Sequence, residues 1–349
     1  MPDVIDTAAL VAAAERAGFD LGAQKTAYRL LESWRARGLL PHPIRVGKDG
    51  KRTIWAYPTR TDQQLLALLR WRQKTRNSLD AVKAALWAEG FDIPLADART
   101  SMLNVLENIE KALVAELAKF TPDGVDPRTL DEHPKTFRMA ITAWADEVAR
   151  MRSRSPIPRD LSASMTLPQR TRAMAYWLSF AAGVTPDPSD AHYLELLFGI
   201  RRGRAAPLAG VLPDSPEETF PTWMAQHPRA LHEAVATAPD AALHLVQSML
   251  QTTLTLFPLI APVLISADVQ TTKFLDRMFG FLDEASPESI VLLAAVQIAN
   301  IERKAADDQT LEHFAKLLKP ASIWNELKPK LSTDQQKEVK SRAQERKAR

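Results

Sequence analysis

Hydrophobic positions along this chain recur mostly at the spacing of α-helices. From about Ala23 to Ala36, the apolar residues Ala27, Leu30, Leu31 and Trp34 stand at i, i+3, i+4 and i+7, so they share one face of a helix. The opposite face carries polar and basic residues. The pattern therefore predicts a helix that packs on its domain through one side and presents the other side to solvent or to a partner.

A short region after this helix alternates in the manner of β-strands. The runs PIRV (43–46) and RTIWAY (52–57) are rich in β-branched and aromatic residues, and GKDGK joins them. The pair Asp49-Gly50 tolerates the positive φ of a tight hairpin turn. The sequence therefore predicts a two-stranded hairpin directly after two helices, which is the arrangement of a winged helix-turn-helix.

Two further helices are predicted after the hairpin. Thr61 and Gln64 match the S/T-x-x-E/Q capping box, in which the two side chains bond free N–H groups at a helix start. Ser78 is expected to cap the helix that follows, which ends at Gly90. These elements complete an N-terminal domain over residues 1–92.

Positive charge is concentrated in this domain. The segment from Lys25 to Arg76 contains thirteen Lys or Arg residues and three acidic ones, whereas the whole chain carries a net charge of +3. Such segregation suits a polyanion such as nucleic acid, although exposed helices and turns also carry cations that only keep a surface solvated. The candidate DNA-contacting residues on the helix and the hairpin are Lys25, Tyr28, Arg29, Ser33, Arg35, Arg37, Lys48, Lys51 and Arg52.

SWRARGLLP (33–41), the hairpin, an arginine-bearing helix and NSLDAVKAAL (77–86) together resemble the DNA-binding domain of MerR-type regulators. The resemblance covers roughly the first quarter of the chain and implies a winged helix-turn-helix that binds duplex DNA, usually as a dimer. Glu32 stands where the family generally has a DNA-contacting arginine. Because the chain has no cysteine, the thiol-based sensing common in that family is excluded. The matching residues are Trp34, Gly38, Leu39, Leu40, Pro41, Ser78 and Leu79.

A heptad pattern follows the basic domain. Leu95, Met102 and Ile109 recur every seven residues, and so do Leu106 and Leu113. This spacing predicts one long amphipathic helix within residues 93–122. A coiled coil through these five side chains would join two DNA-binding domains on successive half-sites. A helix that packs on its own C-terminal domain gives the same pattern.

Beyond a break at TPDGVDP (121–127), helical patterns continue and no convincing strand is evident. Phe137, Ile141 and Trp144 form one apolar stripe, and Ser286-Pro287 is typical of a helix start. Residues 123–328 are therefore predicted to form an all-helical domain. A basic tail follows over residues 329–349.

The chain shows no pattern typical of secretion or membrane insertion. Asp3, Asp6 and Glu15 interrupt the N-terminal region, which lacks a basic start followed by an apolar core. The stretch from Ala241 to Ala267 has no charged residue, but its prolines and polar side chains fit buried helices better than a membrane span. We therefore expect a cytoplasmic protein with no membrane partner.

Catalytic patterns are absent from the sequence. There is no Walker-type phosphate loop, HExxH, GxSxG or Rossmann glycine pattern. His227 and His232 would lie on different helix faces, so no zinc site is expected. We expect no enzymatic activity, no cofactor and no metal. Trp144, Trp177 and Trp223 are candidates for the lining of a small apolar ligand pocket, although aromatics at helical spacing more commonly form core.

The sequence thus predicts a mainly α fold, with an N-terminal winged helix-turn-helix and its small β-hairpin wing, a long connecting helix and an all-α C-terminal domain. The expected function is sequence-specific binding of double-stranded DNA by a homodimeric transcriptional regulator. A small apolar ligand or a protein partner is expected on the C-terminal domain. A replication, partition or recombination accessory protein is an alternative, as is a helical interaction scaffold that does not read DNA.

Overall fold

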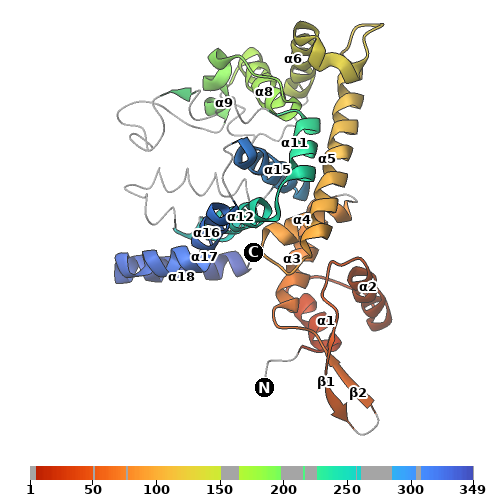
Figure 1. Cartoon of the computed structure of the whole chain (residues 1–349), viewed down its shortest axis with the longest axis vertical. Helices are drawn as coiled ribbons and strands as arrows, with labels where there is room; N and C mark the ends of the chain where they lie inside the picture. Colours follow the sequence, from red (N-terminus) through yellow and green to blue (C-terminus); the bar gives the residue numbers. More distant parts are fainter. Residues whose placement is uncertain are drawn as a thin grey trace. The chain divides into compact units, whose positions relative to one another are not determined.

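The computed structural model describes residues 5–49, 52–75, 78–150, 165–197, 215–216, 226–256, 258–260, 285–303 and 308–348 (Figure 1). Within these residues the chain is mainly helical, as predicted, with a two-stranded antiparallel hairpin near the N-terminus. In Figure 1 the hairpin is the pair of arrows labelled β1 and β2.

Contacts divide the chain into two compact units. Unit 1 comprises Met1–Val105, Ala238–Leu256 and Glu284–Leu327, and unit 2 comprises the remaining segments. Unit 1 therefore combines the N-terminal elements with two segments from the second half of the chain. The ranges 1–92, 93–122, 123–328 and 329–349 stay a prediction about the domain organisation.

Unit 1 contains the basic region and its supporting helices. Its elements are α1 (Thr7–Arg16), α2 (Gln24–Ala36), β1 (Ile44–Asp49), β2 (Arg52–Ala56), α3 (Thr61–Lys74), α4 (Leu79–Ala88), the first part of α5 (Leu95–Ala118), α12 (Asp240–Gln251), the π-helical segment η4 (Thr252–Leu256), α15 (Pro287–Arg303), α16 (Asp308–Leu317) and α17 (Pro320–Leu327).

In the described part of unit 2 the elements are helices. Its elements are the second part of α5, η1 (Pro127–Glu132), α6 (Pro134–Arg150), α8 (Leu167–Ala182), η2 (Pro188–Asp190), α9 (Ala191–Leu197), α11 (Pro228–Thr237), η5 (Lys328–Lys330) and α18 (Thr333–Ala348).

Two N-terminal helices begin at side-chain caps. The Asp6 carboxylate accepts a hydrogen bond of 2.7 Å from the Ala9 N–H at the start of α1. The Ser78 hydroxyl accepts one of 3.1 Å from the Ala81 N–H at the start of α4, which confirms the predicted cap. Each cap satisfies an N–H group that has no partner within its helix.

The predicted capping box at the start of α3 is wrong. The cap position is Arg60, in the left-handed region at φ +71°, and Thr61 is already helical. The Thr61 hydroxyl donates to the carbonyl oxygen of Pro58, at 2.7 Å. The Gln64 amide donates instead to the main-chain carbonyl oxygen of Leu39, at 2.9 Å. The Gln64 side chain, which the local pattern assigned to the start of α3, therefore bonds a residue that is distant in sequence.

The predicted hairpin is present, but Asp49, which was predicted in the turn pair, lies at the end of β1. Asp49 pairs with Arg52, so two residues connect the strands, and a register shift between Arg45 and Gly47 marks a β-bulge. The turn residues Gly50 and Lys51 lie outside the described residues. At the base of the hairpin, the Tyr57 N–H donates to the Ile5 carbonyl oxygen, at 2.7 Å.

Helix α4 lies in the core of unit 1. Residues 84–88 are at most 2% exposed, and α4 packs against α3, α12 and α15. The Gln247 side-chain amide donates to the carbonyl oxygen of Trp87, at 2.9 Å, and so satisfies one of the last carbonyls of α4. The apolar segment that begins at Ala241 thus includes a buried helix, α12, as its polar residues suggested. Within the described residues, no helix is long and apolar enough to cross a membrane.

The long helix α5 is present over Leu95–Ala118, and its heptad residues face different environments. Met102, Leu106 and Leu113 are buried within this single chain, whereas Leu95 and Ile109 are half-buried. A coiled coil through the three buried side chains would require them to leave this packing. Their burial favours a helix that packs on its own chain, and dimerisation stays a prediction.

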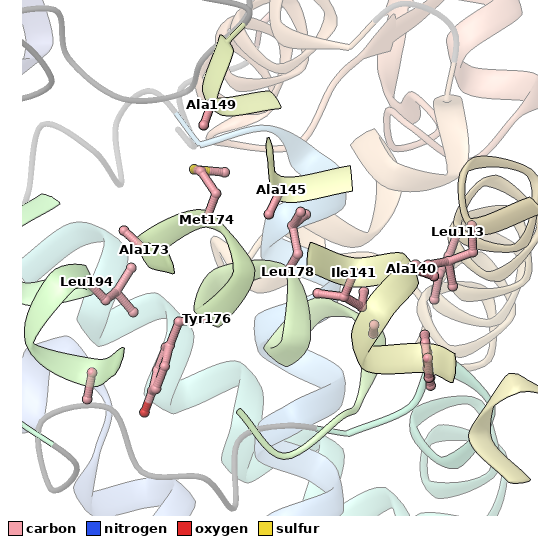
Figure 2. Packing of buried hydrophobic residues seen from close by; sticks show 14 of the residues in the cluster. Leu113, Ala140, Ile141, Ala145, Ala149, Ala173, Met174, Tyr176, Leu178 and Leu194 are labelled. Carbon is pink, nitrogen blue, oxygen red and sulfur yellow. The ribbon is translucent and has the colours of Figure 1, made fainter. Parts of the chain in front are cut away.

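The core of unit 2 is formed mainly by α6 and α8 (Figure 2). Ile141 from α6 and Met174 from α8 are each 2% exposed, and both belong to one apolar cluster. Tyr176 and Phe180 stack edge to face with ring centres 5.1 Å apart. Trp144 packs at the margin of the cluster, as part of the predicted stripe.

Candidate nucleic-acid interface

The two faces of α2 differ sharply in exposure and charge. Ala27, Leu31 and Trp34 are buried, at 5% exposure or less. Lys25 and Arg29 are exposed one turn apart, as i and i+4 positions of the same face. The apolar stripe thus fixes α2 to unit 1, and the cationic face projects away from that stripe.

The other residues predicted on this helix surround the cationic face. Tyr28 is half-buried, and its hydroxyl accepts a hydrogen bond of 3.1 Å from the Gln24 amide. Ser33 and Arg35 are half-buried, and Arg37 is exposed just beyond the helix. These side chains border an exposed surface that combines hydrogen-bonding groups with positive charge.

These cations are not neutralised within the described part of unit 1. Lys25, Arg29, Arg35 and Arg37 form no ion pair with another described residue. By contrast, Arg70 near the end of α3 pairs with Glu89 at 3.7 Å. Cations without internal partners keep their full attraction for an external polyanion.

An acidic residue interrupts the same face. Glu32 is exposed and lies three positions after Arg29, so the two side chains are neighbours on the helix surface. A carboxylate there repels phosphate, but it also accepts hydrogen bonds from the amino group of cytosine.

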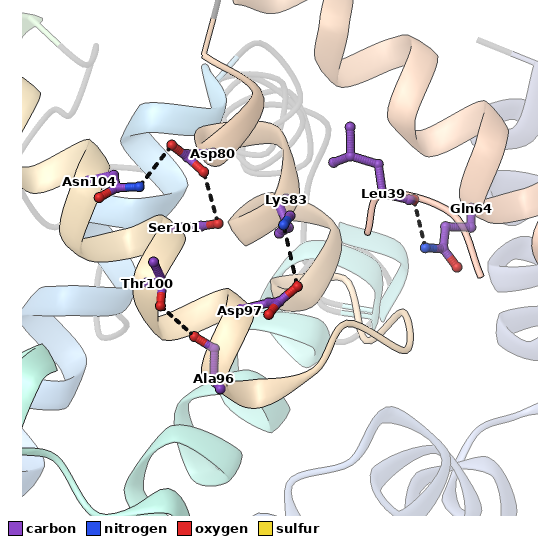
Figure 3. A network of polar contacts seen from close by, with 9 residues as sticks. All are labelled: Leu39, Gln64, Asp80, Lys83, Ala96, Asp97, Thr100, Ser101 and Asn104. Atoms are coloured by element: carbon purple, nitrogen blue, oxygen red, sulfur yellow. Dashed lines mark hydrogen bonds and ion pairs between the residues drawn. The ribbon is translucent and has the colours of Figure 1, made fainter. Parts of the chain in front are cut away.

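Buried contacts position the chain that leaves α2. Leu39 and Leu40 are 0% and 3% exposed, and the Leu39 N–H donates to the Trp34 carbonyl oxygen at 2.9 Å. The bond from Gln64 to the Leu39 carbonyl connects this segment to α3 (Figure 3). The main-chain N–H and carbonyl of Leu39 are thus both hydrogen-bonded, one to α2 and the other to α3. These two bonds hold the end of α2 against α3.

A surface hollow of about 720 Å³ borders the end of α2. Its lining includes Arg35, Arg37, Lys83, Asp80 and Asp97. Lys83 pairs with Asp97 at 3.4 Å, and Asp80 accepts hydrogen bonds of 3.1 Å from Ser101 and Asn104 (Figure 3). Lys83, Asp97 and Asp80 in the lining of this hollow therefore already bond to other side chains of unit 1. Among the described residues, no group of His, Asp and Glu is arranged to hold a metal ion.

The hairpin adds a second basic surface. Arg45 and Lys48 are exposed on β1, and Trp55 on β2 is 56% exposed. Of the predicted tip residues, Lys48 is exposed, Lys51 lies outside the described residues, and the backbone of Arg52 lies in β2.

Sequence reasoning missed Arg45 and Trp55 as candidate contacts. Their alternation along the two strands was visible in the sequence. Their exposure was not, because a strand residue faces solvent only where no other element covers its face. The register pairs Arg45 directly with Trp55, so the two side chains lie on one face of the hairpin.

Two of the three aromatic residues proposed for a ligand pocket lie among the described residues of unit 2, and the pocket itself stays a prediction. Trp144 packs against the apolar cluster, and Trp177 is 38% exposed. Trp223 lies outside the described residues.

Unit 2 also contains a small polar cluster. Arg172 pairs with Asp190 at 3.4 Å and donates to the Tyr193 hydroxyl at 3.1 Å. Burial raises the pKa of Asp190 above its ordinary value despite the opposing charge of Arg172.

No family model, curated protein or solved structure matches this chain. The surface chemistry of α2 and the hairpin is therefore the basis for a proposal about function.

Proposed function

We propose that this chain is a DNA-binding protein that uses α2 and the β1–β2 hairpin to contact duplex DNA, as a cytoplasmic transcriptional regulator of MerR-like type. The observation that carries the proposal is the division of α2 into a buried apolar stripe and an exposed cationic face. Ala27, Leu31 and Trp34 hold the helix, whereas Lys25 and Arg29 project from it with no ion-pair partner among the described residues. A helix supported in this way suits the major groove.

The hairpin supports the same proposal. Arg45 and Lys48 are exposed on a ribbon that follows the cationic helix in the chain. In the proposed complex these two cations lie along the phosphate backbone while α2 enters a groove. Phosphate contacts set the register of the helix, and the polar side chains of α2 then read base edges.

The proposal predicts binding that weakens steeply as salt rises, because each phosphate contact releases condensed counterions. We would measure the fluorescence anisotropy of a labelled random-sequence duplex pool, titrated with the full-length chain at several salt concentrations. The full chain is needed because α4 is buried against α12 and α15, which a fragment ending at residue 92 would lack.

Arg29→Ala tests the contact face directly. Removal of one phosphate contact is expected to weaken binding several-fold and to reduce the salt slope by about one. Lys135→Ala is the matched control, because Lys135 is an exposed cation on α6 in unit 2. Absence of duplex binding at low salt, or equal losses in both variants, would contradict the proposal.

A second candidate function is that of a replication, partition or recombination accessory protein that recruits other proteins. Exposed apolar side chains in unit 2 favour it: Met139 is 69% exposed and Leu196 is 41% exposed. Such side chains can serve as contacts for a protein partner. Genome-wide occupancy separates the two functions, because regulators occupy promoters and such accessory proteins gather at one or a few loci.

A further inference from the structure

One face of the hairpin combines a large aromatic side chain with positive charge. The register pairs Arg45 with Trp55 and Lys48 with Thr53. Directly paired residues share a face, and so do alternate residues of one strand. Arg45, Lys48, Thr53 and Trp55 therefore lie on one side of the ribbon, which we call the tryptophan face.

Trp55 contributes little to the buried core of unit 1. Its side chain is 56% exposed, whereas Trp34, Trp71 and Trp87 in the same unit are at most 5% exposed. Arg45 and Lys48 form no ion pair with a described residue, and the four residues of the tryptophan face include no acid. The surface thus offers a flat apolar ring flanked by two free positive charges.

Nucleic acid satisfies both features of this surface at once. Proteins that bind unpaired nucleotides combine cations along the backbone with aromatic rings on which bases stack. In a regular duplex, both faces of each base are covered by neighbouring bases. An aromatic ring then reaches a base only if one step is unstacked, which costs free energy. A base that is already unpaired lacks most of this cost.

We propose that Trp55 stacks on an unpaired or partly unstacked base, so that the chain binds distorted duplex DNA more tightly than regular duplex. This inference rests on the proposed function, and it adds the kind of DNA site that the hairpin prefers. Arg45 and Lys48 hold the phosphates beside the stacked base. The opposite face of the ribbon provides an internal comparison, because Ile54 lies there and is 44% exposed.

The test uses two labelled duplexes that are identical except for one unpaired adenine in the second. The full-length chain is expected to bind the bulged duplex about tenfold more tightly, a factor within the range of base–aromatic stacking. Trp55→Ala should lose most of this preference while its affinity for regular duplex changes by about twofold at most. Trp55→Phe should keep part of the preference, because it keeps a ring.

Two further variants separate stacking from charge and from general hydrophobicity. Lys48→Ala removes a cation from the tryptophan face and should weaken binding to both duplexes equally. Ile54→Ala removes an apolar side chain from the other face and should leave the preference unchanged. A fluorescent 2-aminopurine at the unpaired position should be quenched by the wild-type chain and not by Trp55→Ala.

The outcomes distinguish this inference from the function on which it rests. If the wild-type chain binds neither duplex, the proposed function fails and this inference fails with it. If the chain binds both duplexes equally, or if Trp55→Ala keeps the preference, DNA binding stands and the stacking role of Trp55 is overturned.

Discussion

The side-chain amide of Gln64 donates a 2.9 Å hydrogen bond to the main-chain carbonyl oxygen of Leu39 (Figure 3). The two residues are 25 positions apart, and both are buried, at 4% and 0% exposure. The bond connects α3 to the segment that follows α2. It therefore links the supporting core of unit 1 to the helix that carries the candidate contact residues.

Gln64→Leu should destabilise the chain and also weaken DNA binding. The substitution leaves the buried carbonyl of Leu39 without a donor, which typically costs about 1–3 kcal/mol. Gln63→Leu is the matched control, because Gln63 is exposed on the same helix and should change stability by about 0.5 kcal/mol at most. Urea denaturation gives the stability change and anisotropy gives the affinity. Equal stability of the two variants would show that the bond does not hold α2.

Neutralisation of Glu32 should strengthen duplex binding. A carboxylate a few ångströms from a phosphate in water costs about 1 kcal/mol, so Glu32→Gln should raise the affinity for a random duplex pool about fivefold. Glu233→Gln removes an exposed acid from α11 in unit 2 and serves as the comparison. An unchanged affinity and an unchanged sequence preference would mean that this face of α2 does not approach DNA.

Local patterns in the sequence were enough to predict much of the fold. The spacing of Ala27, Leu31 and Trp34 predicts the orientation of α2, and the hairpin follows from two β-prone runs around a turn pair. The Ser78 cap was predictable because its partner, the Ala81 N–H, is only three residues away in sequence. Each of these features depends on residues that are close in sequence.

Long-range contacts were not predictable in the same way. Gln64 fits a capping box locally, yet its side-chain amide donates to the main-chain carbonyl of Leu39, which is distant in sequence. The burial of α4 against α12 and α15 brings residues more than 150 positions apart into contact, and no periodicity encodes that pairing. The candidate contacts were therefore predicted on α2, where periodicity defines the faces, and at the cations near the hairpin turn. The candidate contact at Trp55 was missed, because exposure there depends on what the rest of the chain leaves uncovered.

A steric test separates two glycines of unit 2. Gly183 ends α8 at φ +72°, and an added Cβ would collide with the backbone of Gln226 and His227. Gly124 has φ +86° and no atom within 4 Å of an added Cβ. Gly124→Ala should therefore cost about 1 kcal/mol from backbone strain alone, whereas Gly183→Ala should cost about 2–4 kcal/mol. Thermal or urea denaturation measures both. Similar losses would argue against close packing of the segment before α11 on the end of α8.

The stability of unit 2 should depend on the charge of Asp190, with a sign set by its surroundings. Burial raises the pKa of Asp190, and its Oδ1 atom has no hydrogen-bond partner among the described residues. A carboxyl group with a raised pKa binds its proton more tightly in the folded state than in the unfolded state. Its contribution to stability therefore falls as pH rises through the window between its ordinary pKa and the raised value.

Asp190→Asn should accordingly stabilise unit 2 at neutral pH, and the gain should shrink as pH falls to about 4 and below. Asp187 provides a control of opposite sign, because hydrogen bonds from the Ser189 side chain and backbone lower its pKa. Asp187→Asn should lower stability at neutral pH, and that loss should fade as acid protonates the wild-type carboxylate. Urea denaturation followed across the range from pH 3 to pH 8 measures both differences. If Asp190→Asn is the less stable protein at neutral pH, the attraction of Arg172 outweighs the cost of burying this carboxylate.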